Sequence, residues 1–444
     1  MKSTKCRVAL GGLLASFAAI LILLGSALAS GPSEAVIYSF GVSNSTPYAG
    51  LVADSAGNLY GTTLWGDSLP NGSVFELSPS GSGWSQTTLF VFDGANGSFP
   101  AGPMILDKSG NLYGNTSQGG TGNCSSGSSR VGCGVVFELS PPVSGGTWTE
   151  TVLYNFQGGN DGQRPYDNLV MDAAGNLYGT TTSGGTGCAP QGCGTVFRLK
   201  PPAQKGGAWT ETVLHRFNGT DGSGPAGITL KGGALYGAAS GGPSNNGLIY
   251  KVKMGSELQM GSGTTETVLY NFSGSDGAGP GGVVFGADGN MYGVTGGGGQ
   301  DNWGTVFELT QTSGGTWAEA VLYDFTGGAD GANPNSPVIL DEDGNLYGTT
   351  YTGGLTTECG WISPEDGCGV VFKVSPSAAG GAWTETVLHS FSDARSDGNI
   401  PINTGVVFGK GGDLYGTTAY GGNGGCVAER GNTVNCGTVY RQMR

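Results

Sequence analysis

Charged residues and histidine are scarce in this chain. Asp, Glu, Lys and Arg make up only 12% of its 444 residues, and the chain has two histidines. A His-based catalytic triad or a histidine-bound metal would therefore have to use His215 or His389. The chain also lacks a Gly-x-Ser-x-Gly elbow, a His-Glu-x-x-His motif and a phosphate-binding lysine loop. These absences remove common signatures of hydrolases, zinc peptidases and nucleotide-binding enzymes.

Helical periodicity and long apolar runs are missing from residue 30 onward. The first 29 residues differ, because three basic residues precede an apolar run and Ala27-Leu28-Ala29 forms a small-residue cleavage site. An uncleaved membrane anchor would need a longer apolar run. We expect residues 1–29 to be a removed signal peptide and the protein to be secreted, periplasmic or extracellular, without a membrane span.

Acidic residues dominate the small charged fraction. Removal of the three basic residues near the N-terminus changes the formal net charge from −14 to −17. A chain this acidic should repel nucleic acid and anionic lipid surfaces, so no nucleic-acid partner is expected.

A Leu-Tyr-Gly phrase, or in one copy Met-Tyr-Gly, recurs seven times, at intervals of 53 to 68 residues. A repeat of this size is one supersecondary unit that buries its apolar face against its neighbours. The tyrosines, which we interpret as packing residues, are Tyr60, Tyr113, Tyr178, Tyr236, Tyr292, Tyr347 and Tyr415.

The third repeat shows four strand-like segments, 168–172, 177–181, 195–199 and 209–217. Their β-branched and aromatic residues alternate with polar ones, and Gly, Pro and Asn separate them. Four antiparallel strands per repeat are typical of a propeller blade. The sequence therefore predicts an all-β fold, a seven-bladed β-propeller with four antiparallel strands per blade.

The mature chain, residues 30–444, is expected to form this one domain. Its last segment, 437–441, resembles a third strand, whereas the segment 34–40 resembles the fourth-strand phrase at 150–156. The N-terminal strand should therefore complete the last blade and remove the open sheet edges. The expected blades are 45–92, 100–156, 165–217, 225–272, 280–325, 336–391, and 402–444 with 34–40.

Eight cysteines of the mature chain fall into four local pairs, each in the loop after a Leu-Tyr-Gly strand. One pair per loop, with no histidine beside it, gives too few ligands for tetrahedral zinc, so we expect no metal site there. Four local disulfides formed in an oxidising compartment are the favoured interpretation. They would join Cys124 to Cys133, Cys188 to Cys193, Cys359 to Cys368 and Cys426 to Cys436.

Two longer phrases recur in the repeats, Asp-x-x-Gly-Asn-Leu-Tyr-Gly-Thr-Thr at 172–181 and 341–350, and Gly-x-Val-Phe at 194–197 and 369–372. With these phrases the repeat resembles the GloVer-type tandem repeat of secreted bacterial proteins and, more loosely, the NHL-type propeller blade. The resemblance covers essentially the whole mature chain. It implies an exported propeller and no established activity.

Loop length varies on one side of the expected blades, where the cysteine loops and the connections between blades emerge. Asp-Gly pairs recur in these connections, and the pattern is typical of turns, although a ring of carboxylates could instead bind calcium or sugar hydroxyls. No cofactor is expected, with calcium as the open alternative. The aspartates are Asp161, Asp221, Asp276, Asp330 and Asp397, with Asn96 at the sixth position.

His215 and His389 occupy the fourth-strand position that is Tyr154, Tyr270 or Tyr323 in sister repeats. We interpret them as substitutes for an aromatic residue rather than as a catalytic pair.

The favoured function is a non-catalytic, monomeric binding protein for glycan or an envelope protein, acting through the loop-rich face. The fourth-strand tryptophans could stack on sugars, but their uniform position favours packing. The alternative is a glycan-active hydrolase or lyase with acidic residues at the channel mouth. Trp361 and Glu365, in an atypical loop of the sixth repeat, are further candidate ligand-binding residues.

Overall fold

The structure, a computed structural model, describes most of the chain after residue 32. The described residues are 33–41, 45–66, 70–126, 129–254, 265–354, 359, 367–377, 380–392, 394, 396–402, 405–423 and 436–444. The expected signal peptide lies outside them, and so do Trp361, Glu365 and Cys426.

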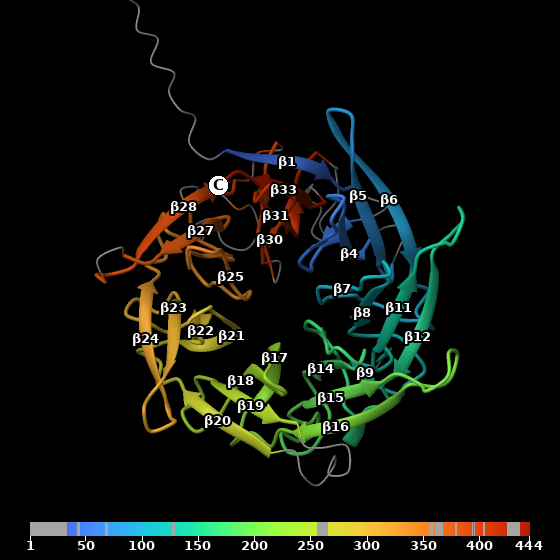
Figure 1. Ribbon diagram of the computed structural model, residues 1–444, viewed down its shortest axis with the longest axis horizontal. Helices are drawn as coiled ribbons and strands as arrows, with labels where there is room; N and C mark the ends of the chain where they lie inside the picture. The colour runs from blue at the N-terminus through green and yellow to red at the C-terminus, as the bar shows by residue number, and fades with distance from the viewer. Residues whose placement is uncertain are drawn as a thin grey trace, which may run out of the picture. The chain divides into compact units, whose positions relative to one another are not determined.

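Seven antiparallel sheets follow one another around a ring, and each sheet is one blade of a propeller (Figure 1). In blades 3 to 6, four consecutive strands pair in chain order, from the innermost strand to the outermost. This arrangement confirms the predicted all-β fold with seven blades of four antiparallel strands. Among the residues that the structure describes, there is no helix whose length and hydrophobicity would suffice for a membrane crossing.

The strands of the first four blades have the following bounds. Blade 1 contains β2 (Ser45–Pro47), β3 (Val52–Ala53), β4 (Leu59–Trp65), β5 (Ser73–Ser80) and β6 (Gly83–Val91). Blade 2 contains β7 (Ile105–Leu106), β8 (Leu112–Thr116), β11 (Val135–Ser140) and β12 (Thr149–Asn155), with a ribbon of β9 (Ser125–Ser126) and β10 (Ser129–Arg130). Blade 3 contains β13 (Val170–Met171), β14 (Leu177–Thr181), β15 (Thr195–Lys200) and β16 (Thr210–Arg216). Blade 4 contains β17 (Ser223–Lys231), β18 (Ala234–Ser240), β19 (Leu248–Lys253) and β20 (Thr265–Asn271).

The remaining blades continue the pattern. Blade 5 contains β21 (Ala278–Phe285), β22 (Met291–Gly297), β23 (Thr305–Gln311) and β24 (Trp317–Asp324). Blade 6 contains β25 (Ile339–Leu340), β26 (Leu346–Thr349), β27 (Val370–Ser375) and β28 (Thr384–Ser390). Blade 7 contains β30 (Val407–Phe408), β31 (Leu414–Thr418), β33 (Thr438–Gln442) and β1 (Glu34–Ser39), beside a ribbon of β29 (Gly398–Asn399) and β32 (Tyr420–Gly421). A 3-10 turn, η1 (Gly159–Asp161), lies between blades 2 and 3.

The N-terminal strand β1 closes the ring, as predicted. It pairs antiparallel with β33 from Glu34, opposite Gln442, to Ser39, opposite Thr438. The Phe40 N–H donates to the carbonyl oxygen of Gly437 at 3.0 Å, so the pairing continues just past the strand. Blade 7 thereby gains an outer strand and has the four-stranded sheet of its neighbours.

The junctions between blades share one aromatic contact. A buried phenylalanine after the outer strand of each blade meets a buried ring on the third strand of the next blade, edge to face, with centroids 5.0 to 5.2 Å apart. Such pairs stabilise packing beyond the area that they bury. The pairs are Phe40–Phe75, Phe92–Phe137, Phe156–Phe197, Phe217–Tyr250, Phe272–Phe307, Phe325–Phe372 and Phe391–Tyr440.

This packing explains the residues of the Leu-Tyr-Gly phrase. A Cβ at its glycine would lie 2.3 to 2.6 Å from the nearest atom of the third-strand aromatic side chain, for example Gly61 from Cζ of Phe75 at 2.5 Å, so no side chain fits. The leucine is buried in the same core. The Tyr178 hydroxyl donates to Asp172 Oδ2 at 2.9 Å, which ties the second strand to the turn before it. These contacts have the packing role expected of the tyrosines.

A second glycine contact recurs where the third strand begins. Gly194 has φ +95°, and a Cβ there would lie 2.3 Å from the Thr181 carbonyl oxygen and 2.6 Å from Cδ of Pro225 in the next blade. The equivalent glycines of the other blades also approach a proline of the following blade, at 2.4 to 2.8 Å. Each junction therefore depends on a glycine that has both a left-handed backbone and no room for a methyl group.

We expect Gly194→Ala to lower the free energy of unfolding by about 3 kcal/mol, because it adds a clash to left-handed strain. Gly206→Ala is the matched control, since Gly206 has φ +83° and open space around it. That control should cost about 1 kcal/mol. Urea denaturation of both variants measures the difference, and equal losses would contradict the proposed contact with Pro225.

Candidate functional site

The cysteine loops and the connections between blades lie together on one face, which we call the loop face. Antiparallel bridges join them, as between Ser98 and Gln118, Gln163 and Ser183, and Ala332 and Thr352. In blades 2 and 6 the loop also returns alongside itself through parallel glycine bridges. The pairing order therefore brings the loops of variable length to one side of the ring.

Three of the four predicted disulfides are confirmed. Cys124–Cys133, Cys188–Cys193 and Cys359–Cys368 join residues whose Cα atoms are 5.0 to 5.3 Å apart. Cys436 is also disulfide-bonded, and its predicted partner Cys426 lies outside the described residues. The disulfides fix the loops of the loop face, and disulfides persist in oxidising compartments.

The Asp-Gly aspartates cap turns next to the outer strands. Asp276 accepts hydrogen bonds from the Tyr270 hydroxyl at 2.6 Å and the Ser273 N–H at 2.7 Å. Asp330 accepts equivalent bonds from Tyr323 and Thr326, and Asp161 from Tyr154 and Gln157. Asp221 and Asp397 bind an N–H of their own connection and contact a histidine. This geometry is that of turn caps, and calcium binding by these residues stays a prediction.

A glutamate of the next blade lies near each of these five aspartates, and a sixth glutamate lies near Asp93; none of the six was predicted from the sequence. It lies in the Glu-Thr or Glu-Ala phrase of the outer strand, and its Oε1 is buried without a hydrogen-bond partner in the described part of the chain. Burial raises the pKa of each of these carboxyls to about 7. A nearby aspartate adds to each rise. The residues are Glu34, Glu150, Glu211, Glu266, Glu319 and Glu385.

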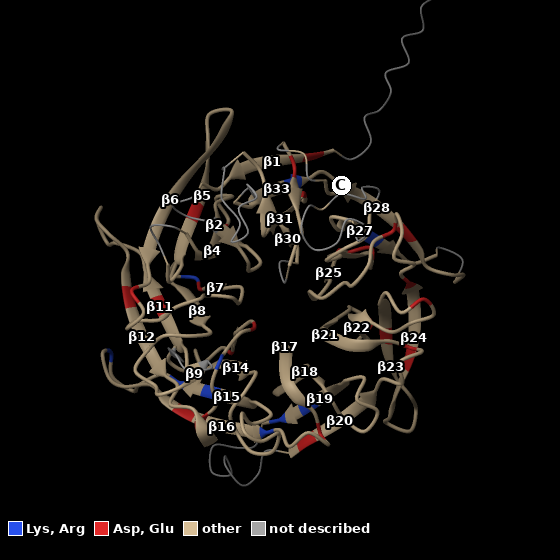
Figure 2. Ribbon diagram, turned by 180° about the vertical axis from the view of Figure 1, so that it is seen from behind, with Lys and Arg blue, Asp and Glu red and all other residues tan. Residues whose placement is uncertain are grey.

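Blade 1 departs from this arrangement in a consistent way. Gln86 pairs with Leu77 in the register that Glu211 has with Leu199 in blade 3. The connection that precedes blade 1, residues 41–44, contains no aspartate. A neutral side chain thus replaces glutamate at the junction that lacks the opposing carboxylate. Figure 2 shows acidic segments on the outer strands β12, β16, β20 and β24.

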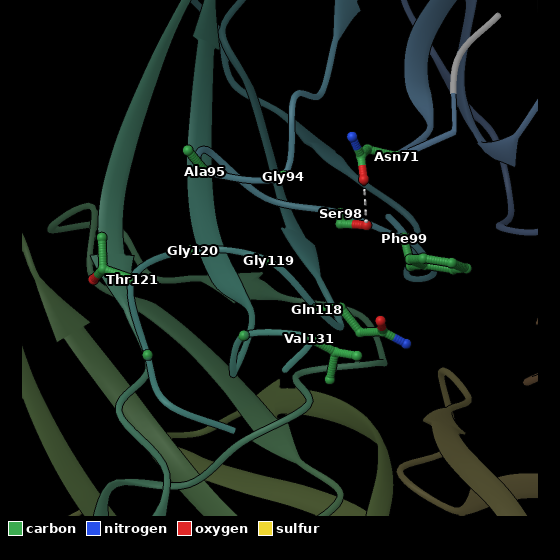
Figure 3. A pocket seen from close by; sticks show the side chains of 12 residues that line it. Asn71, Gly94, Ala95, Ser98, Phe99, Gln118, Gly119, Gly120, Thr121 and Val131 are labelled. Atoms are coloured by element: carbon green, nitrogen blue, oxygen red, sulfur yellow. Dashed lines mark hydrogen bonds between the residues drawn. The ribbon is translucent and has the colours of Figure 1, made fainter. Parts of the chain in front are cut away.

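A cleft lies on the loop face between blades 1 and 2 (Figure 3). Its volume is about 570 Å³, within the range of small-ligand sites. Its lining is mainly backbone of glycine-rich loops together with Asn71, Ser98 and Gln118. Phe99 lines the cleft and stacks edge to face on Trp65 at 5.7 Å. Trp65 is 42% exposed and is connected to the cleft through this contact with Phe99.

The backbone fixes Phe99 in position. It has φ 59°, although it precedes Pro100, and its N–H donates to the Asn71 carbonyl oxygen at 3.0 Å. The residue before the equivalent proline is left-handed in every blade. Left-handed conformation in non-glycine residues is strained and persists only where surrounding contacts impose it. The junction therefore orients the Phe99 ring before any ligand binds.

Further aromatic residues lie on the innermost segments. Tyr48 and Tyr166 meet edge to face at 6.3 Å, although they belong to blades 1 and 3. Burial raises the pKa of Tyr420 to about 12, and nearby Tyr351 and Tyr48 add to this rise. A smaller cleft of about 240 Å³ contains Tyr166 and Asp167 among inner residues of five blades. Asp167 accepts N–H groups of Asn168 and Gly227, and its burial raises its pKa.

The fourth-strand tryptophans pack between blades. Trp148 contacts Tyr60 at 6.3 Å, Trp84 contacts Tyr415 at 5.9 Å, and Trp383 contacts Tyr292 at 6.1 Å. Trp209 and Trp317 join the corresponding junction cores. The aromatic rings that border the clefts are thus a different set. In the sequence, these rings are aromatic residues at positions where sister repeats have a small or polar residue. Trp65, for example, aligns with Gln118 and Ser183.

No curated protein matches the chain. Among solved structures, a putative 6-phosphogluconolactonase from Bacteroides uniformis is similar, with 13% identity and a TM-score of 0.48, over 80% of this chain and 85% of that chain. A putative oxidoreductase (glucose dehydrogenase) from Thermus thermophilus is also similar, with 14% identity and a TM-score of 0.40, over 93% of this chain and 100% of that chain. The Gloeobacter/Verrucomicrobia repeat profile matches residues 28–250 and again 233–442. The chain therefore belongs to the Gloeobacter/Verrucomicrobia repeat family, as its repeated phrases predicted.

Proposed function

We propose that this protein is an exported, non-catalytic propeller that binds carbohydrate on its loop face, in the cleft between blades 1 and 2. The observation that carries the proposal is the Trp65–Phe99 pair, an exposed and a pre-oriented ring beside a polar cleft. Aromatic faces bury the apolar C–H surface of a sugar ring, while amide and backbone groups bind its hydroxyls. Asn71 and Gln118 supply amides, and the Gly119–Gly120 segment supplies backbone groups.

The chemistry of the lining supports binding rather than catalysis. The lining residues described for this cleft include no carboxylate and no histidine. Glycoside hydrolysis requires two carboxyl groups at a defined separation. Asp167 is the one carboxylate among the described lining residues of the inner cleft. The hydrolase or lyase alternative would therefore depend on residues such as Glu365, outside the described part of the chain.

We expect Trp65→Ala to weaken binding of an oligosaccharide by tenfold or more, because it removes a stacking surface of the site. The ligand is first selected on a glycan array, and its affinity is then measured by isothermal titration calorimetry. Trp303→Ala is the matched control, because Trp303 is 38% exposed and lies in a loop of blade 5. It should leave the affinity unchanged.

Three results would contradict this proposal. Equal losses in both tryptophan variants would place the effect outside the cleft. Binding of an envelope protein but of no glycan would favour the protein-ligand alternative. Release of new reducing ends from a bound polysaccharide, abolished by Glu365→Gln, would favour the hydrolase.

A further inference from the structure

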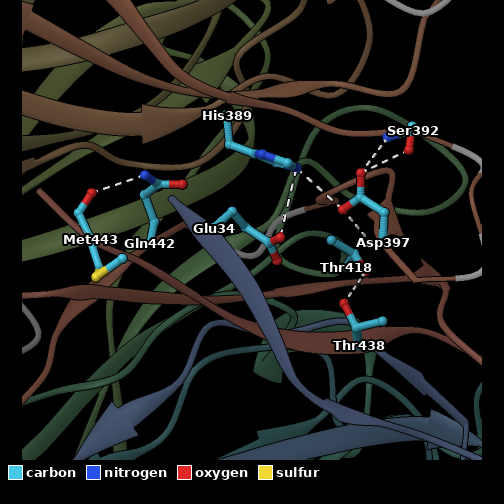
Figure 4. A network of polar contacts seen from close by, with 9 residues as sticks. Glu34, His389, Ser392, Asp397, Thr418, Thr438, Gln442 and Met443 are labelled. Carbon is cyan, nitrogen blue, oxygen red and sulfur yellow. Dashed lines mark hydrogen bonds and ion pairs between the residues drawn. The ribbon is translucent and has the colours of Figure 1, made fainter. Parts of the chain in front are cut away.

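Both histidines of the chain lie at blade junctions, each between two carboxylates. At the junction of blades 6 and 7, His389 Nε2 lies 3.2 Å from Asp397 Oδ1 and 4.0 Å from Glu34 Oε2 (Figure 4). One ligand atom from each residue lies within 4.8 Å of the others. His389 comes from β28, Asp397 from the connection after it, and Glu34 from the closing strand β1. Three segments of the chain thus converge on one point.

Glu34 is directed into this cluster and lacks a partner for one oxygen. Its side chain is only 7% exposed, and its Oε1 is buried without a hydrogen-bond partner in the described part of the chain. A buried carboxylate oxygen without a hydrogen bond is costly unless a proton or a cation compensates it. Every junction glutamate has such an oxygen, but only Glu34 and Glu266 have their carboxyl beside an imidazole and an aspartate, where a cation could replace the compensating proton.

The other two residues are arranged as ligands would be. Asp397 accepts hydrogen bonds from the Ser392 N–H at 3.0 Å, the Ser392 hydroxyl at 2.8 Å and the Gly398 N–H at 2.8 Å, which fix its carboxylate. Such outer contacts orient metal-binding carboxylates. The His389 ring stacks on Phe391 at 4.9 Å and remains 21% exposed, so solvent reaches the cluster.

The junctions with tyrosine at this fourth-strand position show what a histidine there changes. At three of them a tyrosine hydroxyl donates directly to the aspartate, at 2.6 to 3.0 Å, from Tyr154, Tyr270 or Tyr323. A tyrosine hydroxyl completes the contact as a hydrogen-bond donor, whereas imidazole Nε2 either donates to the aspartate or, in the other tautomer, offers a lone pair to a metal ion. The second histidine repeats the arrangement, since His215 Nε2 lies 3.3 Å from Asp221 Oδ2 and Glu266 completes the group.

We propose that His389, Asp397 and Glu34 bind a divalent transition-metal ion, Zn²⁺ in particular, and that His215, Asp221 and Glu266 form a second such site. One imidazole nitrogen and two carboxylate oxygens suit Zn²⁺ better than calcium, which prefers oxygen ligands alone. Tetrahedral ligands at zinc distances lie about 3.3 Å apart, so the 3.2 Å between His389 and Asp397 fits, and Glu34, at 4.0 Å from His389, has to move inward. Water would occupy the fourth position.

Metal at the first site would link the closing strand to the neighbouring blade. Glu34 lies at the start of β1, which pairs with β33 of blade 7, whereas His389 and Asp397 belong to blade 6 and its connection. An ion that binds the folded chain and not the unfolded chain stabilises the fold. The first site would therefore stabilise ring closure, and the second would stabilise the junction of blades 3 and 4.

The test is calorimetric titration of Zn²⁺ into the chelator-treated protein. We expect two ions per chain in the natural protein, one in His389→Tyr, one in His215→Tyr and none in the double variant. These variants recreate the tyrosine junctions of sister blades, so the fold should persist. Tyr323→His, beside Asp330 and Glu385, should add a third ion. Zn²⁺ should also raise the Tm of the natural protein by several degrees and leave that of the double variant unchanged.

Glu34→Gln provides an independent variant, because glutamine occupies the equivalent position in blade 1 as Gln86. It should weaken the first site at least tenfold without affecting the second. An absence of stoichiometric Zn²⁺ binding would overturn the proposal. So would binding that the double tyrosine variant retains, because the ion would then lie elsewhere on the chain.

Discussion

A chain without residues 33–40 is expected to lose about 5 kcal/mol or more of its free energy of unfolding. This deletion removes β1, leaves β33 as an open edge and exposes the ring of Phe75, on which buried Phe40 packs at 5.0 Å. Loss of a buried phenylalanine alone costs about 3–5 kcal/mol, and the lost strand adds its own pairing. The measurement is urea denaturation followed by tryptophan fluorescence.

Point variants distinguish the contribution of the Phe40–Phe75 contact to stability from that of the strand pairing. Phe40→Ala should account for more than half of the loss, whereas Val143→Ala, at a fully exposed position, should change the stability by less than about 0.5 kcal/mol. A peptide spanning residues 30–42 should restore part of the Tm of the deleted chain by adding the missing strand. An unchanged Tm after the deletion would show that the ring does not depend on its N-terminal strand.

Raising the pH from about 5 to about 8 is expected to destabilise the protein. Burial raises the pKa of Glu150, Glu211, Glu319 and Glu385 from 4.5 to about 7 in the folded chain. Between these values the folded chain holds protons that the unfolded chain releases, so the stabilisation is complete below about 4.5 and lost as the pH rises through 7. We expect a loss of about 1 kcal/mol per glutamate, less than the full shift implies, because water screens these half-exposed side chains.

The turn aspartates have the opposite effect on stability: they destabilise the protein as the pH falls, in a lower pH range than the glutamates. Burial opposes the change, but hydrogen bonds from neighbouring N–H and hydroxyl groups lower the pKa of Asp54, Asp172, Asp276 and Asp341 below 3.8. Their stabilisation is present above about 3.8 and is lost as the pH falls through their folded-state pKa values. The two groups together place the maximum of stability near pH 4 to 5.

Glutamine variants test the origin of this pH dependence. A chain with Glu150→Gln, Glu211→Gln, Glu319→Gln and Glu385→Gln should lose less of its Tm between pH 5 and 8 than the natural chain, because only Glu34 and Glu266 then keep a pKa raised to about 7, and it should have the higher Tm at pH 8. Gln86 shows that the junction accommodates glutamine. Glu342→Gln, at an exposed turn, is the control and should leave the slope unchanged. A natural protein whose Tm rises from pH 5 to 8 would contradict the account.

Most of the fold was predictable because each blade repeats its local pattern. The Leu-Tyr-Gly and Gly-x-Val-Phe phrases mark the second and third strands, and the glycines of both are required by contacts within or next to their own blade. Ring closure was predictable since the segment 34–40 repeats a fourth-strand phrase that the last repeat lacks. The local disulfides followed from the same short loop in several repeats.

The candidate sites were less accessible from sequence, because they join residues of different repeats. Glu266 faces Asp221, and Glu34 faces Asp397, across a junction that becomes visible only when the blades are placed side by side. Trp65 and Phe99 occupy different positions of their repeats, so no shared motif marks them as a pair. Alignment of the repeats would have shown both as aromatic residues at positions where most other repeats have a non-aromatic one.

Carbohydrate binding on the loop face can be tested by a crystal structure of the protein with an oligosaccharide that it binds. We expect an intact sugar chain in the cleft between blades 1 and 2, with one ring stacked on Trp65 or Phe99 and hydroxyl contacts to Asn71 or Gln118. Sugar bound on the opposite face, or a cleaved product beside a pair of carboxylates, would contradict it.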